Sequence, residues 1–179
     1  MKTVLVEFGQ YLQERSLHLE VTIIGGAALL IMGVIERATQ DVDCLEPDLP
    51  EEILRDSREF AIGYKGPASP LREDWLNNGP RDLRNDLPSG WRARRELICE
   101  SPGLTLRTLG RSDLLKSKLF AFCDRGQDQS DCLALAPTLP ELREAVDWVT
   151  ERDANSLWPA HVRGSFRALA ERLGYEFEP

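Results

Sequence analysis

Apolar residues recur along this chain at two periods, and the change of period separates expected helices from expected strands. Residues 3–17 place their apolar side chains at helical spacing, which predicts an amphipathic helix with one buried face. Residues 19–24, LEVTII, are typical of a strand, and residues 26–35 predict a short helix. Because that helix is apolar on nearly every side, we expect it to be buried.

Further along, a third helix is expected to run to about Gly63. Asp48 and Glu51 stand three residues apart at its start, in the spacing of a capping box, with Pro50 in the first turn. Residues 64–90 are rich in Gly, Pro and Asn and show no long periodic element. Loops of this length are usually functional, so we expect a lid or a substrate-facing loop there.

The rest of the chain predicts a β-hairpin followed by helices. Residues 92–100 and 104–109 are joined by Ser-Pro-Gly, and helices are expected over 113–123, 131–136, 138–152 and 156–174. This order predicts an α+β fold, in which a small mixed sheet is flanked by helices and followed by a C-terminal helical part. We expect one domain over residues 1–136, with helices 137–179 packed on it.

Composition narrows the class of protein. A chain of 179 residues that is 42% hydrophobic and 29% charged has the balance of a globular domain with a substantial core. No apolar run reaches the ~18 residues of a membrane span, and Glu7 and Gln10 interrupt any secretory signal core. The four cysteines are scattered, without a Cys-x-x-Cys pair, so we do not expect a zinc site. We expect the protein to be cytoplasmic.

Charge is distributed unevenly. The net charge of −8 is unlike that of a free-standing nucleic-acid-binding domain. Between Arg81 and Lys118, however, nine basic residues stand against five acidic ones. This basic strip has two interpretations: it faces an acidic metal site and receives a triphosphate or an RNA end, or its arginines pair with local acids on a solvated surface.

Candidate chemistry is concentrated between Val21 and Pro47. Asp41 and Asp43 are two residues apart on an expected strand, so their side chains should share one face while Val42 and Cys44 face the core. Two adjacent carboxylates repel each other unless a cation lies between them. Mg²⁺, which takes oxygen ligands and bridges carboxylates to substrate phosphates, suits such a pair.

Gly25 and Gly26 supply the complementary half of such a site. They follow an expected strand and open an expected helix, where free backbone N–H groups face an anion. A side chain at either position would hold phosphates away from those groups. The segment therefore predicts a phosphate cradle beside a metal pair.

These residues carry a family resemblance. A Gly-Gly pair after a strand, followed by Arg37, Thr39, Asp41 and Asp43 in the spacing Arg-x-Thr-x-Asp-x-Asp, resembles the polymerase-β-type nucleotidyltransferase superfamily. The spacing is similar to small bacterial stand-alone members, including the AbiEii-type toxins of toxin–antitoxin pairs. A minimal family of this kind also carries Asp-Trp-Leu-Asn, here residues 74–77, and a later segment with these residues: Lys118, Arg125, Asp128 and Asp131.

The resemblance, which covers most of residues 20–136, implies a nucleotidyltransferase-type sheet and a Mg²⁺-dependent enzyme. Asp41 and Asp43 would hold the metal, and an NTP would donate NMP to a hydroxyl of RNA, such as a tRNA end, or of protein. The substrate-binding residues that it implies are Gly25, Gly26, Thr39, Lys118 and Asp131. In these terms Lys118 contacts the triphosphate, and Asp131 orients Lys118 or the loop that precedes Asp131. A cognate antitoxin is an expected partner.

Some assignments depart from the superfamily pattern or stay open. A third carboxylate normally lies on a strand next to the first two; we expect Glu96, with Glu100 and Asp74 as alternatives. Gly26 and Ala27 offer no phosphate-binding serine. Trp75 would either stack on a nucleobase or anchor its loop.

Two other classes of function remain. One is a catalytically degenerate member that binds nucleotide or a partner protein. The other is a haloacid-dehalogenase-type phosphohydrolase, which the Arg-Ala-Thr-Gln approach to Asp41 and the presence of Leu45 disfavour.

Overall fold

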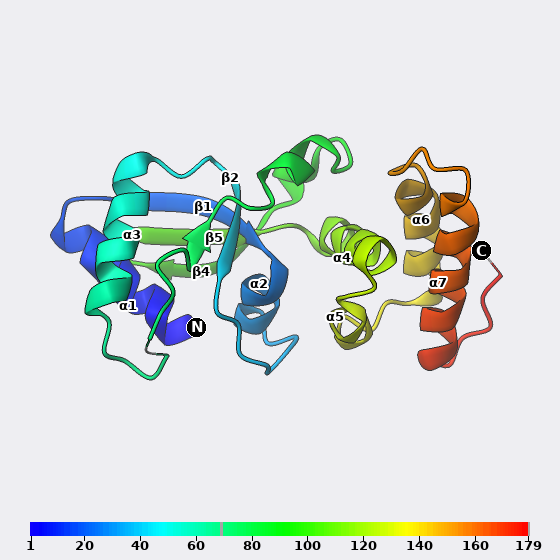
Figure 1. The fold of residues 1–179 in the computed structure, drawn as a ribbon, viewed down its shortest axis with the longest axis horizontal. Coiled ribbons are helices and arrows are strands. Elements are labelled where there is room, and N and C mark those ends of the chain that lie inside the picture. Colours follow the sequence, from blue (N-terminus) through cyan, green and yellow to red (C-terminus); the bar gives the residue numbers. More distant parts are fainter. Residues whose placement is uncertain (69, 179) are drawn as a thin grey trace. The chain divides into compact units, whose positions relative to one another are not determined.

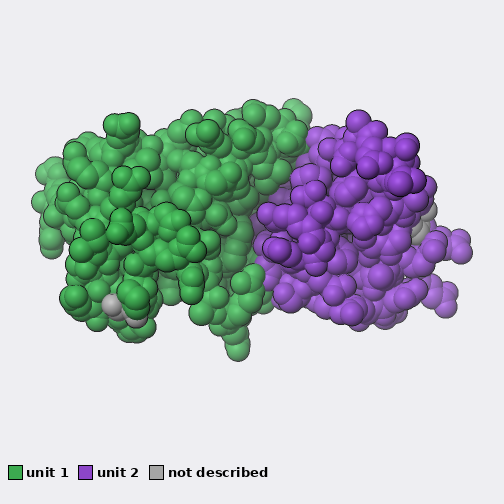
Figure 2. Space-filling view, viewed as in Figure 1, with its two compact units in different colours: residues 1–110 green, residues 111–179 purple. Residues whose placement is uncertain are grey.

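The computed structural model describes residues 1–68 and 70–178 (Figure 1). Contacts within the chain divide it into two compact units, which we call unit 1, residues 1–110, and unit 2, residues 111–179 (Figure 2). The division falls before the fourth helix, whereas the sequence placed a domain boundary after residue 136. The boundary after residue 136 stays a prediction. The two units are described separately below.

Unit 1 is built on a five-stranded mixed sheet with the order β3-β2-β1-β5-β4. Central β1 is antiparallel to β2 and parallel to β5, β3 is parallel to β2, and β4 is antiparallel to β5. The strands are β1 (Leu19–Ile24), β2 (Val42–Glu46), β3 (Leu76–Asn77), β4 (Glu96–Ser101) and β5 (Leu104–Thr108). The α+β fold with a small mixed sheet and a C-terminal helical part is thereby confirmed, and β3 is the strand that the sequence did not predict.

The described residues of unit 1 also form these helices: α1 (Lys2–Glu14), α2 (Gly25–Ile31), α3 (Glu51–Gly63) and the short 3₁₀-helices η1 (Arg81–Asn85) and η2 (Trp91–Arg94). The expected capping box of α3 is wrong, because the helix begins after Pro50 without a side-chain cap. The Asp48 carboxylate instead accepts a hydrogen bond from Arg84 at 3.0 Å. A guanidinium fork offers a carboxylate stronger, charge-assisted bonds than a helix N–H does.

One face of the sheet forms the main core. Alternate residues of the strands, Val21, Ile23, Val42 and Cys44 among them, are at most 1% exposed and pack against α1 and α3. Trp75 is fully buried, with its ring 5.2 Å from that of Phe8, and its indole N–H donates to a backbone carbonyl on α3. Trp75 therefore anchors its segment, and the alternative of a nucleobase-stacking platform is wrong.

The expected loop over residues 64–90 is held down along much of its length. Residue 69 lies outside the described part of the chain; around it, Tyr64, Trp75, Leu76 and Leu87 are buried. The Asn78 side chain links three backbone positions, accepting from the N–H of Leu49 at 2.7 Å and donating to the carbonyls of Cys44 and Pro47. The segment is thus fastened to β2 and to the entrance of α3, which does not suit a lid over its whole length.

Unit 2 is helical and contains α4 (Arg111–Arg125), α5 (Gln129–Ala134), α6 (Leu139–Thr150) and α7 (Trp158–Arg172). The predicted capping box of α6 is present, with Thr138 accepting from the N–H of Glu141 and Glu141 accepting from the N–H of Thr138. The predicted glycine after the last helix, Gly174, has the left-handed φ of +82°. Within the described residues, no helix has the length and apolarity that crossing a membrane would require.

Candidate functional site

Asp41 and Asp43 lie where the end of β1 meets the start of β2. Asp43 is paired in register with Ile24, the last residue of β1, and Asp41 immediately precedes β2. Val42 and Cys44 are fully buried in the core, while the two aspartates are only half-buried. The alternation expected for this segment therefore holds for its core-facing members and leaves the carboxylates accessible.

Thr39 holds the first of these carboxylates. Its hydroxyl lies 3.2 Å from the backbone carbonyl of Asp41 and 3.2 Å from Oδ1 of the same residue. A hydroxyl has one proton to donate, so these two oxygens share it. Thr39 thus orients Asp41, and its place among the substrate-binding residues stays a prediction.

The two glycines of the turn have different surroundings. Gly25 has a φ of +75°, and a Cβ added to it would lie 2.6 Å from Oδ2 of Asp43. A Cβ on Gly26 would instead meet the Thr39 hydroxyl at 3.4 Å and the guanidinium nitrogens of Arg37 at 3.6 Å, which is ordinary contact. Gly25 is therefore required by the backbone and by Asp43, whereas the space at Gly26 is bounded by a hydroxyl and a cation.

The position next to Asp43 on the neighbouring strand is occupied by an amide. Asn77 of β3 is paired in register with Asp43, and its Oδ1 accepts a hydrogen bond of 2.7 Å from the N–H of Gly79. A Cβ on Gly79 would lie 4.0 Å from Oδ1 of Asp43, so this turn passes close to the carboxylate. Sequence reasoning missed β3 because two residues are too few to show a period of two.

Glu96 is not brought to this place. It lies on β4, at the far edge of the sheet, with β5 and β1 between it and β2. At about 4.8 Å per strand, that separation is roughly 14 Å. The alternatives fare no better, since Glu100 is on the same strand and Asp74 forms an ion pair of 2.8 Å with Arg72.

In unit 2 the structure brings Lys118 and Asp131 together. The Lys118 ammonium donates to Oδ2 of Asp131 at 2.7 Å and to Oδ1 of Asp128 at 2.8 Å. Lys118 is 5% exposed and Asp131 is fully buried, while Arg125 contacts Asp128 from outside at 3.3 Å. The expected orienting contact is present, and the contact of Lys118 with a triphosphate stays a prediction.

Most of the basic strip is neutralised by local acids. Arg92 and Arg95 both contact Glu46, and Arg107 donates to Glu20 at 2.8 Å. The hydrogen bond from Arg92 lowers the pKa of Glu46. The same local pairing holds for Arg84 with Asp48, Arg111 with Glu141 and Lys116 with Glu144. The structure therefore favours the interpretation of a paired surface.

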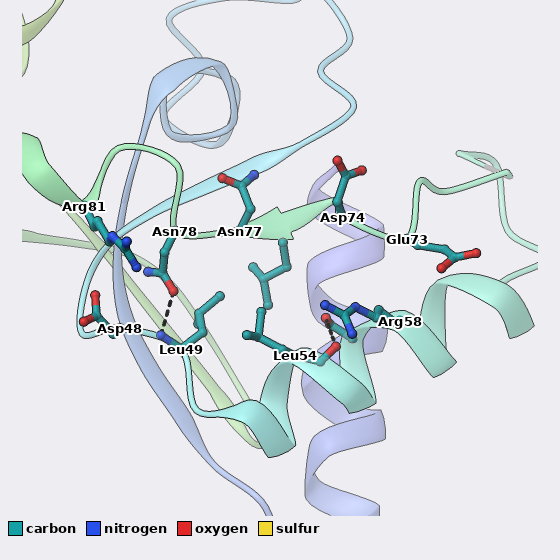
Figure 3. A pocket seen from close by; sticks show the side chains of 11 residues that line it. Asp48, Leu49, Leu54, Arg58, Glu73, Asp74, Asn77, Asn78 and Arg81 are labelled. Atoms are coloured by element: carbon teal, nitrogen blue, oxygen red, sulfur yellow. Dashed lines mark hydrogen bonds between the residues drawn. The ribbon is translucent and has the colours of Figure 1, made fainter.

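A shallow pocket of about 280 Å³ lies beside the edge strand β3. Figure 3 shows Leu49 and Leu54 on its floor, Arg58 from α3 on one side and Arg81 from η1 on the other. Asn77 also lines it, so this pocket, which we call the β3 pocket, borders the strand position next to Asp43.

The side chains around Asp43 have the type of ligand atom that magnesium prefers. Asp41, Asp43 and Asn77 offer only carboxylate and amide oxygens, which are hard ligands, and Mg²⁺ is commonly held by one or two carboxylates together with substrate phosphates and water. Within the described residues, no cluster of three or more His, Cys, Asp and Glu side chains is placed to hold a metal. Any metal here therefore depends on the two aspartates and on oxygens from its other ligands.

Comparison with known families decides the classification. Residues 2–148 match the model of family DUF6036, described as a nucleotidyltransferase of unknown function. The chain belongs to this family. The predicted membership of the nucleotidyltransferase superfamily is confirmed, and the particular likeness to AbiEii-type toxins stays a prediction. No curated protein and no solved structure matches the chain.

Proposed function

We propose that this nucleotidyltransferase is Mg²⁺-dependent and moves NMP from an NTP to a hydroxyl of RNA or protein. The observation that carries the proposal is the contact between the glycine turn and a carboxylate. Asp43 Oδ2 fills the space that a Cβ on Gly25 would need, so a phosphate received at this turn lies beside a metal-binding oxygen. The family membership gives the reaction class.

Each neighbouring residue has a part in this proposal. The space at Gly26, which the Thr39 hydroxyl and the Arg37 guanidinium border, receives the phosphates, and Arg37 supplies positive charge there. Thr39 fixes the orientation of Asp41. Asp41 and Asp43 would hold Mg²⁺, which when bound neutralises phosphate charge and lowers the pKa of the acceptor hydroxyl.

The bond changes follow from the substrates. The acceptor oxygen forms a bond to the α-phosphorus, and the bond from that phosphorus to the bridging oxygen of the β-phosphate breaks. Pyrophosphate leaves with the electron pair, and the proton of the hydroxyl passes to solvent. By the toxin resemblance, a tRNA end as acceptor, an antitoxin partner and a cytoplasmic location belong to the same proposal.

A second candidate function is nucleotide or partner binding without turnover. Asn77 favours it, because an amide stands in register with Asp43 where a neighbouring strand of an active enzyme usually carries an acid. An amide oxygen can still complete a metal shell, but it cannot accept a proton as a base at neutral pH. Transfer of label to an acceptor distinguishes the two candidates.

The test uses titration calorimetry with Mn²⁺ and each NTP on the full chain, followed by transfer of label from α-³²P-NTP to RNA and to protein. Asp43→Asn should weaken Mn²⁺-dependent NTP binding by at least about 10- to 100-fold. It removes a metal-binding oxygen and keeps the shape of the side chain.

Glu96→Gln is the matched control, since it makes the same change of charge on β4. It should bind Mn²⁺ and NTP as the wild type does. If Glu96→Gln loses binding as Asp43→Asn does, or if Asp43→Asn binds at wild-type strength, the assigned site is wrong. Binding without transfer to either acceptor would support the second candidate.

A further inference from the structure

The β3 pocket contains the unit 1 arginines that have no partner within the described residues. Unit 1 has eleven arginines. Nine of them contact an acid, a carbonyl, a hydroxyl or another group. The remaining two, Arg58 and Arg81, both line the β3 pocket and are exposed. They come from different elements, α3 and η1, so the fold rather than local sequence brings them to one place.

The acids of the pocket leave part of this positive charge uncompensated. Asp48 is occupied by Arg84 at 3.0 Å, and Asp74 by Arg72 at 2.8 Å. Among the pocket acids this leaves Glu73, which forms no ion pair with Arg58 or Arg81 within the described residues. The chain as a whole has a net charge of −8, whereas this pocket offers two guanidiniums that no acid neutralises directly within the described residues.

From this we infer that the β3 pocket binds the phosphate backbone of an RNA acceptor. The inference rests on the proposed function and names its acceptor class. A guanidinium presents several N–H donors in a fork that matches phosphate oxygens. An RNA strand carries an anion at every nucleotide whatever its sequence, so both arginines can be engaged at once. A protein acceptor would need two acidic side chains placed to match.

Size and position agree with this ligand. A volume of about 280 Å³ is slightly below the usual range of ligand sites, and the pocket is open, which suits a part of an extended RNA strand. Asn77 lines the pocket and is paired in register with Asp43, so an RNA bound there lies beside the β-strand next to the one that carries Asp43. The pocket thus lies close enough to the proposed transfer site to hold an RNA whose end is the acceptor.

The experiment measures binding of a short fluorescein-labelled single-stranded RNA by anisotropy across a salt series. The variant is Arg58→Gln with Arg81→Gln, and the control is Arg163→Gln with Arg167→Gln, two exposed arginines of α7. Removing two phosphate contacts should weaken RNA binding about tenfold and reduce the salt slope by about 1.4. The control should keep the wild-type affinity and slope.

A second measurement separates this inference from the proposed function. NTP binding with Mn²⁺ should be unchanged in the double pocket variant, because the glycine turn and its carboxylates are intact. Loss of NTP binding in that variant would overturn the inference by showing that the pocket holds the nucleotide itself. Unchanged RNA affinity, an equal loss in the α7 control, or labelling of protein without RNA binding would also overturn it. Absence of NTP binding in the wild type would defeat the proposed function and leave the RNA result intact.

Discussion

At the scale of single residues, the two glycines of the turn are not equivalent. Gly25 combines a φ of +75° with the close approach of Asp43, so any side chain there strains the backbone and pushes the carboxylate away. Gly26 has room for a Cβ beside Thr39 and Arg37. One glycine serves the fold and the metal pair, and the other keeps the space that we assign to phosphate.

This difference predicts that substitutions at the two glycines impair different properties. Gly26→Val should abolish NTP binding while Mn²⁺ affinity and the thermal midpoint stay near the wild type, because its methyl groups occupy the phosphate space. Gly25→Ala should lower the thermal midpoint, at a cost of about 1 kcal/mol or more for a strained backbone, and weaken Mn²⁺ binding. Calorimetry and thermal melting on both variants measure these effects. NTP binding at wild-type strength in Gly26→Val would contradict the phosphate assignment.

The sequence identified some site residues and misplaced others for physical reasons. Asp41 and Asp43 could be found because the buried Val42 and Cys44 reveal the alternation of the strand. Glu96 was misplaced because periodicity locates strands without giving their order in the sheet. Asn77 could not be found by pattern, since its strand has only two residues and its pairing with Asp43 is a tertiary contact.

At the scale of elements, the start of α6 joins a capping box to an ion pair. Glu141 accepts hydrogen bonds from Arg111 at 2.6 Å and from the N–H of Thr138 at 2.8 Å. The Arg111 bond first, and then the bonds from Thr138, lower the pKa of Glu141 to about 2. The carboxylate therefore stabilises the fold fully above its ordinary pKa of 4.5, and this contribution is lost as the pH falls towards 2.

We expect Glu141→Gln to reduce the free energy of unfolding at pH 7 by about 1 kcal/mol, the usual scale of a capping interaction. The difference between variant and wild type should shrink between pH 4.5 and about 2, where Glu141 becomes protonated. Urea unfolding across that pH range measures the difference. If the difference in the free energy of unfolding between variant and wild type stays constant down to pH 2, the charge of Glu141 contributes nothing to stability.

The ends of some elements could be predicted from the sequence and the ends of others could not. The bounds of β1 and the capping box of α6 were found because both depend on adjacent residues. The start of α3 was misjudged because Asp48 is drawn to Arg84, a residue far away in sequence. A local sequence pattern cannot predict a pair between residues that are far apart in the chain.

At the scale of the whole molecule, the two units share an apolar interior, and unit 2 adds a buried lysine–aspartate pair. Unit 1 has the apolar core between its sheet and α1 and α3. Unit 2 also encloses a charged group, the Lys118 ammonium between two aspartates, one of which is fully buried. Removing one partner of a buried pair leaves the other charge uncompensated.

Lys118→Met should therefore destabilise unit 2 by about 3–5 kcal/mol, the usual cost of breaking a buried ion pair. Hydrogen exchange should accelerate in α4 to α7 and stay slow in β1 and β5. Lys116→Met serves as the control, because Glu144, its partner, is mainly exposed. Equal acceleration in both units would show that the chain unfolds as one, contrary to this expectation.

Among the residues that the structure describes, Arg58 and Arg81 have no partner, and this has a consequence for the evolution of the protein. Replacing either residue leaves no buried charge behind, and exposed positions of this kind usually alter stability by no more than about 0.5 kcal/mol. Selection on folding therefore places little restraint on them, in contrast to Lys118 or Gly25. Substitutions at the positions of Arg58 and Arg81 should therefore accumulate among members of the family and change which acceptor is bound. The glycine turn and its aspartates should stay unchanged.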